Sequence, residues 1–442
     1  MAMLRAMTAS LPSLLLLLAC ARDGSLEVEL SPAVETVAIA RWSTDQAELG
    51  RVRWGRDGAW EGELEEEGAS EGDGASEGST THELVVAGLY PDQVYDFQVR
   101  ADGDWSRRSV RLETGSPPAR LAQLDAEGDP GAFHGYLPLA MIGVSPGIQV
   151  VDATGEVVWY AALSDPTHQA RRVWYLPRDR RFLVNAQDGD EVGHLFEIPL
   201  DGSEQREIPV EEHHHDFLVL PDGDLLLLGR DERELDGAMV RGDRLIRQAP
   251  DGSRQTVWST WDALDPSLLP IDEEGDWTHA NAIDHYPERG LVLVSLRNMD
   301  GILALDDQTF ELQWALGGPL GTLSLDEASA FKRQHQFELL DDNRLVVFDN
   351  HSVATDDGGA RVVAFQLDME AGTATELWRY HHDPSLRVEA LGNVDWLSTG
   401  STLITWSTAG EVQVVDPEGV VEWQLNTQVG AGLGFGDRFD RF

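Results

Sequence analysis

Three histidines, His215, His279 and His335, open successive copies of one sequence repeat, and Arg297 closes the copy that His279 opens. Residues at equivalent repeat positions lie at equivalent places in a radially repeating fold, so groups far apart in sequence can meet on one axis. An imidazole can act as a donor, a base or a nucleophile near neutral pH. A guanidinium offers a planar fork of donors that matches an oxyanion. These four residues together predict a site for an anionic group that carries its charge on several oxygens.

The repeat that positions these residues alternates two kinds of strand pair. In the first kind, a strand runs through a turn rich in Asp, Asn and Gly into a more apolar strand. In the second kind, an acidic turn leads into a strand that ends in tryptophan, at Trp159, Trp258, Trp314, Trp378 and Trp423. The period of about 45 to 65 residues is typical of propeller blades. We therefore expect a six-bladed β-propeller over residues 118–442, closed by strands from both ends of this region and packed by the repeat tryptophans.

In a propeller the first strand of each blade lines the central channel. We therefore expect His215, His279 and His335 to approach the mouth of this channel from neighbouring blades. Arg297 follows the second strand of its blade and is expected to reach the same rim.

The N-terminus is predicted to be an export signal over residues 1–20. Arg5 precedes the apolar run Leu14–Leu18, which is too short to span a membrane by itself. The segment that ends at Cys20 resembles the processing box of bacterial lipoproteins, in which the cysteine becomes the acylated first residue. We therefore expect an exported lipoprotein, periplasmic or at the cell surface, anchored in the lipid bilayer through Cys20. The alternative is an ordinary signal peptide with a chance cysteine.

Residues 21–117 are predicted to form a small β-sandwich, so the whole chain is expected to be all-β. Val37–Trp42 and Gly50–Trp54 alternate as strands do, and Leu89–Val99 resembles the leucine–proline–tyrosine corner of fibronectin type III domains. An acidic, low-complexity insert over residues 61–81 is expected to be a disordered loop, and it lacks the oxygen-ligand spacing of a calcium site. The linker-like segment Gly115–Pro118 predicts the boundary to the propeller.

The formal net charge of −45 restricts the partners of this protein. Such a chain repels phosphate backbones, so no nucleic-acid partner is expected. An anion site must be made locally by arginine, histidine and backbone donors. Cys20 is the only cysteine, so the chain can form no disulfide within itself. The oligomeric state stays open.

Six short motifs, taken in order, resemble the bacterial arylsulfate sulfotransferases, which are exported enzymes independent of nucleotide sulfate donors. The motifs are His214-His215-Asp216, Trp277-Thr278-His279-Ala280-Asn281, Ser295-Leu296-Arg297, Trp314-Ala315-Leu316-Gly317-Gly318, Gln334-His335 and Phe348-Asp349-Asn350. The resemblance covers roughly residues 135–423. The chain departs from the family in one respect. The related enzymes carry a disulfide near the site, and this chain, with one cysteine, can form none within itself.

The resemblance implies a ping-pong transfer without a cofactor or metal, in which an aryl sulfate donates its sulfuryl group to His335 and an acceptor phenol then takes it. His215, His279 and Arg297 would hold the sulfuryl oxygens and move protons to and from the phenol oxygens. Asn281 would add a substrate-binding donor. The run of histidines leaves open whether His214 takes the role given to His215.

Two further features of the motifs have alternative interpretations. Asp216 would either fix the tautomer of a histidine or lie on the surface as a solvated carboxylate. The run His213–His215 could also bind zinc, and a histidine-metal hydrolase or lyase is therefore one alternative. Arg297 argues against zinc, because a guanidinium beside a dication is unfavourable without an anion between them. A non-catalytic, lipid-anchored binding protein is the other alternative.

Overall fold

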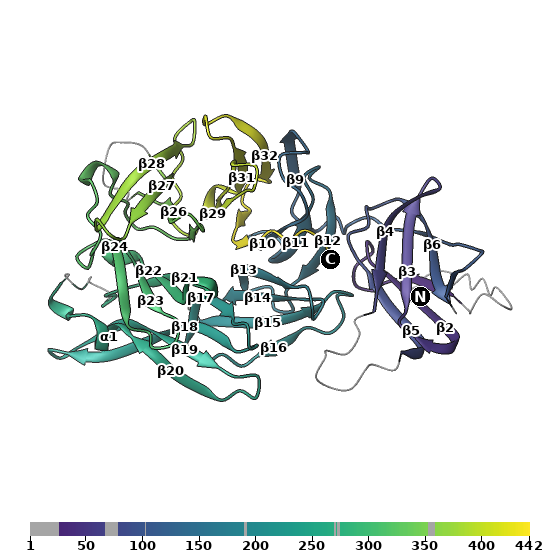
Figure 1. Cartoon of the computed structure of the whole chain (residues 1–442), viewed down its shortest axis with the longest axis horizontal. Coiled ribbons are helices and arrows are strands. Elements are labelled where there is room, and N and C mark those ends of the chain that lie inside the picture. Colours follow the sequence, from purple (N-terminus) through teal and green to yellow (C-terminus); the bar gives the residue numbers. More distant parts are fainter. Residues whose placement is uncertain are drawn as a thin grey trace, which may run out of the picture. The chain divides into compact units, whose positions relative to one another are not determined.

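The computed structural model describes residues 26–66, 78–101, 103–189, 192–268, 271, 275–351 and 359–442 (Figure 1). The predicted signal peptide with Cys20 lies outside these residues. The described chain is nearly all β, and its single α-helix, α1, spans only Thr260–Ala263. Its five 3-10 helices are Pro266–Leu268, Pro287–Arg289, Arg297–Met299, Glu327–Ser329 and Ser407–Ala409. None of the helices in the described ranges has the length and apolar character that crossing a membrane requires.

The chain divides into two compact units. Unit 1 comprises the described residues up to 31 together with 37–86 and 92–115, and unit 2 comprises 32–36, 87–91 and 116–442. The division between the units differs in one respect from the boundary predicted near residue 117. Two short segments of the predicted N-terminal domain, residues 32–36 and 87–91, belong to unit 2.

Unit 1 consists of two sheets whose strands follow the predicted alternation. The first sheet has the order β1 (Glu27–Leu30), β2 (Ala38–Glu48) and β5 (Ser79–Val86). The second has the order β4 (Ala59–Glu65), β3 (Arg51–Arg56), β6 (Val94–Ala101) and β7 (Asp104–Trp105), with β8 (Val110–Glu113) also paired to β6. Trp42, Val52, Tyr95 and Phe97 are buried in its core.

The acidic segment predicted as a loop over residues 61–81 is narrower in the structure. Residues 61–65 belong to β4 and residues 79–81 to β5, so both ends of the segment are strand rather than loop. Arg56 pairs with Glu61, and Arg51 pairs with Glu65. Cross-strand partners of opposite charge let acidic residues join a ladder that composition alone assigns to a loop. Residues 67–77 lie outside the described ranges.

Within the described part of unit 2, the strands from β9 onward form six sheets of four or five strands (Figure 1). The first contains β10 (Leu137–Ile142), β11 (Gly147–Val151), β12 (Val157–Ala162) and β33 (Gly432–Leu433). The second contains β13 (Gln169–Leu176), β14 (Arg181–Gln187), β15 (Gly193–Pro199), β16 (Arg206–Ile208) and β34 (Phe435–Gly436). The third contains β17 (His213–Val219), β18 (Leu225–Leu235), β19 (Ala238–Gln248) and β20 (Arg254–Ser259).

The remaining three sheets repeat the same order of antiparallel neighbours. The fourth contains β21 (Ala280–Tyr286), β22 (Leu291–Leu296), β23 (Gly301–Asp306) and β24 (Leu312–Gly317). The fifth contains β25 (Phe337–Leu339), β26 (Arg344–Asp349), β27 (Arg361–Asp368) and β28 (Thr373–His381). The sixth contains β29 (Asn393–Trp396), β30 (Thr402–Trp406), β31 (Glu411–Val415), β32 (Val421–Thr427) and, as its outer strand, β9 (Leu124–Gly128).

Strands from the two ends of unit 2 meet in the same sheets, as the sequence predicts. The early strand β9 pairs with β32, which lies beside it in Figure 1. The late strands β33 and β34 pair with β10 and β13.

Apolar clusters join each of these sheets to the next along the chain. One cluster contains Leu228 of β18 and Leu303 of β23, and others link the second sheet to the third, the fourth to the fifth and the fifth to the sixth. Trp159 of β12 packs against Phe182 of β14 with the two rings tilted and their centroids 4.3 Å apart. Leu139 of β10 shares a cluster with the sixth sheet, so the last sheet packs on the first.

The tryptophans that close the repeats bind neighbouring sheets together. The indole nitrogens of Trp159, Trp378 and Trp423 donate to backbone oxygens of Leu200, Pro417 and Ala153 at 2.7, 3.1 and 2.8 Å. Each acceptor lies in the loop region of the next sheet around the unit. These tryptophans therefore combine apolar burial with a fixed polar contact, as expected for residues that pack sheets rather than bind substrate.

Candidate active site

The backbone is bent where the site residues precede or begin the first strands of three sheets. His215 and His279 adopt φ values of 53° and 50°, and Arg333, two residues before His335, adopts 54°. The ladders β17–β18 and β21–β22 shift register at these points. Left-handed backbone at residues other than glycine costs about 1–3 kcal/mol and is concentrated at functional sites, where bulges redirect side chains.

His335 is buried, and the orientation of its ring is fixed by Asn350. The side-chain nitrogen of Asn350 donates to the backbone oxygens of Val388 and Leu391, both at 2.9 Å. Carbonyls only accept, so the amide oxygen of Asn350 must face Nδ1 of His335, which lies 2.7 Å away. Nδ1 of His335 therefore carries the proton, and the lone pair is on Nε2.

The surroundings of His335 keep its imidazole neutral. Burial, together with the nearby charges of Arg297 and His279, lowers its pKa to about 3, although the hydrogen bond with Asn350 opposes this shift. A neutral imidazole with Nε2 unprotonated can act as a nucleophile across the whole neutral range.

Arg297 and His279 form the second part of the site. The backbone N–H of Arg297 donates to the carbonyl of His279 at 3.0 Å. Nδ1 of His279 lies 2.5 Å from the carboxylate of Asp276, which also accepts from Asn298 at 3.3 Å. Burial alone would raise the pKa of Asp276, but its hydrogen bond with His279 and the charges of His279 and Arg241 lower it. The ionised carboxylate therefore orients the ring of His279.

His214 and His215 complete the group, and each ring has a different set of neighbours. Nδ1 of His214 lies 2.9 Å from Nδ1 of His215, and the ring of His215 meets that of His279 at a centroid distance of 4.9 Å. Nε2 of His214 lies 3.1 Å from the carboxylate of Asp243. Burial, followed by the charges of His279, His214 and His335, lowers the pKa of His215 well below its usual value.

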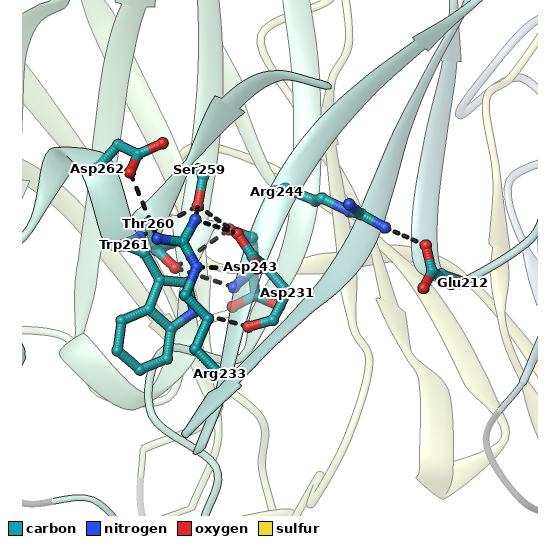
Figure 2. Close-up of polar contacts among 9 residues, drawn as sticks. All are labelled: Glu212, Asp231, Arg233, Asp243, Arg244, Ser259, Thr260, Trp261 and Asp262. Atoms are coloured by element: carbon teal, nitrogen blue, oxygen red, sulfur yellow. Dashed lines mark hydrogen bonds and ion pairs between the residues drawn. The ribbon is translucent and has the colours of Figure 1, made fainter. Parts of the chain in front are cut away.

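The backbone of Asp243 is held by the side chain of Thr260 at the start of α1 (Figure 2). The hydroxyl of Thr260 accepts from the N–H of Asp243 at 2.9 Å and contacts its carbonyl at 3.1 Å. Gly242 permits this close approach, because a Cβ atom there would lie 2.6 Å from the Thr260 hydroxyl. The start of α1 therefore fixes the backbone that carries the Asp243 carboxylate.

A pocket of about 110 Å³ opens beside these histidines. It is lined by His214, His215, Arg230, Arg241, Gly242, Asp243, Asp276, His279 and Ala280. An apolar cavity of about 150 Å³ is known to bind benzene, so this smaller, polar pocket suits a compact anionic group better than an aromatic ring.

The structure groups His214 and His215 with the other predicted site residues. The third histidine of the run, His213, has different neighbours. His213 is buried, its Nδ1 contacts the carbonyl of Leu228 at 3.0 Å, and burial lowers its pKa to about 3. Among the described residues, no group of three or more His, Cys, Asp or Glu side chains is placed to hold a metal ion.

Asn281 contacts the protein rather than an open pocket. Its side-chain nitrogen donates to the carbonyl of Gln334 at 2.8 Å, which ties the start of β21 to the residue before His335. Its buried amide oxygen has no hydrogen-bond partner among the described residues. Donation from Asn281 to substrate stays a prediction, and the contact with Gln334 uses only one of the two N–H donors of this amide.

Both interpretations of Asp216 are wrong. Asp216 is fully buried and accepts from Arg172 at 2.6 Å, from the N–H groups of Phe217 and Ile283 at 2.9 Å, and from Gln336 at 3.0 Å. These donors come from four consecutive sheets of unit 2. Asp216 therefore joins these sheets, and its hydrogen-bond donors within the described ranges include no histidine ring.

Sequence reasoning missed three side chains that orient the histidines, namely Asp243, Asp276 and Asn350. Asn350 stands in a motif that resembles the family, but no role followed from its position. Asp276 lies three residues before His279, a spacing that could have drawn attention to it. No local signal links Asp243 to His214, since the contact depends on how β19 crosses the sheet.

A second group of titratable side chains lies on the first strands of the last three sheets, β21, β25 and β29. Burial, reinforced by the charges of nearby carboxylates, raises the pKa of Glu338 to about 8, although the N–H of Trp396 opposes this. Burial also raises the pKa values of Asp284 and Asp395 to about 6. These carboxyls therefore hold protons at pH values where an unfolded chain would have released them.

Glu338→Gln is expected to stabilise the protein at alkaline pH. A raised folded-state pKa means that the folded chain binds more protons than the unfolded chain between about pH 4.5 and 8, so stability falls as pH rises through this window. Glutamine keeps an oxygen for the N–H of Trp396 and removes the buried charge. Thermal unfolding should show the variant several degrees more stable at about pH 9 and little changed at about pH 4. Equal shifts at both pH values would contradict the assignment of the effect to this ionisation.

Comparisons with known proteins give one family match. Residues 139–428 match the family model described as Arylsulfotransferase (ASST). No curated protein matches the chain.

Several solved structures are similar at low identity. A protein of unknown function from Bacteroides caccae has 16% identity and a TM-score of 0.44, with 69% of this chain and 98% of that chain covered. Inactive virginiamycin B lyase from Staphylococcus aureus with quinupristin has 12% identity and a TM-score of 0.40, with 70% and 90% covered. A chain of the nidogen/laminin complex has 14% identity and a TM-score of 0.43, with 70% and 99% covered.

Proposed function

The chain belongs to the arylsulfotransferase family, and we propose that it moves a sulfuryl group from a phenolic sulfate ester to an acceptor phenol through a sulfohistidine at His335. The observation that carries this proposal is the contact between His335 and Asn350. Because Asn350 accepts from Nδ1 of His335, the nucleophilic lone pair on Nε2 is available without prior loss of a proton.

In the first half of the reaction, Nε2 of His335 attacks the sulfur of the aryl sulfate. The N–S bond forms as the bond between sulfur and the aryl oxygen breaks, and the phenolate leaves with the electron pair. The ring of His335 then carries positive charge, which the carbonyl oxygen of Asn350 stabilises through Nδ1–H. Charge on the sulfuryl oxygens is balanced by Arg297, in a site where positioning and electrostatics provide most of the rate.

In the second half, an acceptor phenol gives its proton to a histidine of the site, its oxygen forms a bond to the same sulfur, and the S–N bond breaks with its electron pair returning to Nε2 of His335. His215 and His279 are the groups proposed to move protons to and from the phenol oxygens and, with Arg297, to hold the sulfuryl group. No cofactor takes part. The pocket of about 110 Å³ lies against His215 and His279, which suits entry of a compact anion at these rings.

The finer architecture and the cellular location are part of this proposal. The six sheets of unit 2, each packed on the next and the last on the first, support a six-bladed β-propeller. The two sheets of unit 1 and the buried Tyr95 support a fibronectin type III-like sandwich. Export, acylation of Cys20 and anchoring to a periplasmic or cell-surface bilayer rest on the residues of the N-terminus.

Mass spectrometry and kinetics together test the proposed function. Protein mixed with 4-nitrophenyl sulfate should gain the mass of one sulfuryl group, located on His335, and release one burst of nitrophenol. Added phenol should speed further nitrophenol release and remove the adduct. Binding of aryl sulfate without an adduct or a burst would instead indicate a non-catalytic binding protein. Activity that is lost with a chelator and restored by zinc would indicate a metal-dependent hydrolase or lyase.

A further inference from the structure

The side chains Asp243, His214 and His215 form a chain of contacts that leads from a buried carboxylate to the candidate site. The side chains of His214 and Asp243 are only 4% and 7% exposed, and their contact of 3.1 Å falls short of an aligned hydrogen bond. Catalytic contacts of this kind are often poorly aligned without substrate and tighten when it binds. The second contact joins Nδ1 of His214 to Nδ1 of His215 at 2.9 Å.

The carboxylate of Asp243 is anchored on its other side. Its Oδ2 accepts from the hydroxyl of Thr278 and, at 2.8 Å, from the N–H of Ala280. Two donors therefore fix Oδ2, and Oδ1 is left to face Nε2 of His214. Because a carboxylate only accepts, this contact becomes a hydrogen bond when the proton of His214 lies on Nε2.

The tautomer of His214 determines that of His215. With its proton on Nε2, neutral His214 has a lone pair on Nδ1 and can only accept there. The nitrogen 2.9 Å away, Nδ1 of His215, must then carry the proton and donate it. The lone pair of His215 is consequently on Nε2, the ring atom on the far side from His214.

We propose that Asp243 is a positioning residue that acts through His214 to hold His215 as the general base for the acceptor phenol. This inference rests on the proposed function. The proton of the phenol passes to Nε2 of His215, the phenol oxygen forms a bond to sulfur, and the S–N bond to His335 breaks with its electron pair returning to Nε2 of His335. Burial of His215 keeps its ring neutral beforehand, which fits a base that starts unprotonated.

Asp243→Asn reverses this arrangement with a minimal change of shape. The donors of Thr278 and Ala280 retain the amide oxygen, so the amide nitrogen faces Nε2 of His214 and donates to it. His214 then carries its proton on Nδ1 and donates to His215, whose own proton moves to Nε2. The lone pair that accepts the phenol proton is lost, while His335 and Asn350 are unchanged.

Measuring the two half-reactions separately distinguishes the proposed role of Asp243 from a purely structural one. Release of nitrophenol from 4-nitrophenyl sulfate requires no acid, because its phenolate is a stable leaving group, so the burst of Asp243→Asn should stay within a few-fold of wild type. Transfer to phenol should fall by roughly 10²–10⁴-fold, the usual contribution of a general base. An acidic phenol that is already ionised at the assay pH needs no base and should restore transfer. His214→Phe should show the same pattern by breaking the chain at its middle.

Glu212→Gln is the matched control, since it also converts a carboxylate to an amide and lies two residues before His214 in the sequence. The side chain of Glu212 is 62% exposed, and its carboxylate pairs with Arg244 (Figure 2). This control should keep both half-reactions.

Three results would overturn the proposed role of Asp243. These are wild-type transfer by Asp243→Asn or His214→Phe, equal loss of burst and transfer in folded Asp243→Asn, and no rescue by the acidic phenol. Absence of a burst in the wild-type protein would instead contradict the proposed function itself.

Discussion

His335→Ala is expected to abolish sulfuryl transfer, with kcat/KM for 4-nitrophenyl sulfate falling on the order of 10⁴-fold or more. The substitution removes the only ring whose Nδ1 is held by Asn350, so no other histidine can replace its Nε2 in the same place. Truncation of this buried side chain leaves the positions of Arg297 and His279 unchanged, because their mutual contact is through the backbone. Stopped-flow release of nitrophenol and the intact mass of the protein measure the effect.

A matched histidine elsewhere in the fold controls for this experiment. His285 belongs to β21, and its Nε2 pairs with Asp307 at 3.1 Å, away from the histidine group. His285→Ala should keep both the burst and the sulfuryl adduct. A normal burst in His335→Ala, or an adduct found on His215 or His279, would place the nucleophile elsewhere.

The positions of strands could be predicted from the sequence because the repeat is periodic and its turns are marked. The repeat that begins at His215 is found within β17 and β18, and the repeat from His279 to Arg297 is found as β21 and β22. Equivalent repeat positions also predicted that His215 and His279 meet, and their rings are 4.9 Å apart.

The contacts that orient the histidines could not be predicted, because each depends on which strands become neighbours. Asn350 reaches His335 only because β26 folds back beside the segment that ends in Gln336. Asp216 was assigned to a histidine or to the surface from its place in the sequence. The left-handed backbone at His215 and the register shift beside it interrupt the alternation of side chains along β17, so the direction of the Asp216 side chain does not follow from its place in the sequence.

Asp216→Ala is expected to cause a large loss of stability, about 3–5 kcal/mol in the free energy of unfolding. Removing this carboxylate leaves the guanidinium of Arg172, which is only 5% exposed, without its strongest partner. It also leaves the N–H groups of Phe217 and Ile283 and the amide of Gln336 without their acceptor. Buried donors that lose their partners cost more than the same bonds contribute when formed.

Arg172→Met tests whether the loss of stability in Asp216→Ala comes mainly from the unpaired charge of Arg172 or from the number of hydrogen bonds lost. In this variant the carboxylate of Asp216 keeps three donors, and methionine fills part of the space of the arginine stem. The loss of stability should therefore be smaller than in Asp216→Ala. Once Asp216 is gone, replacing Arg172 as well should cost little or restore stability, because this removes a buried cation that keeps only the half-exposed carboxylate of Asp437 as its ion-pair partner. Denaturant unfolding of the two single variants and the double variant measures this coupling, and additive losses would show that the ion pair does not join the sheets.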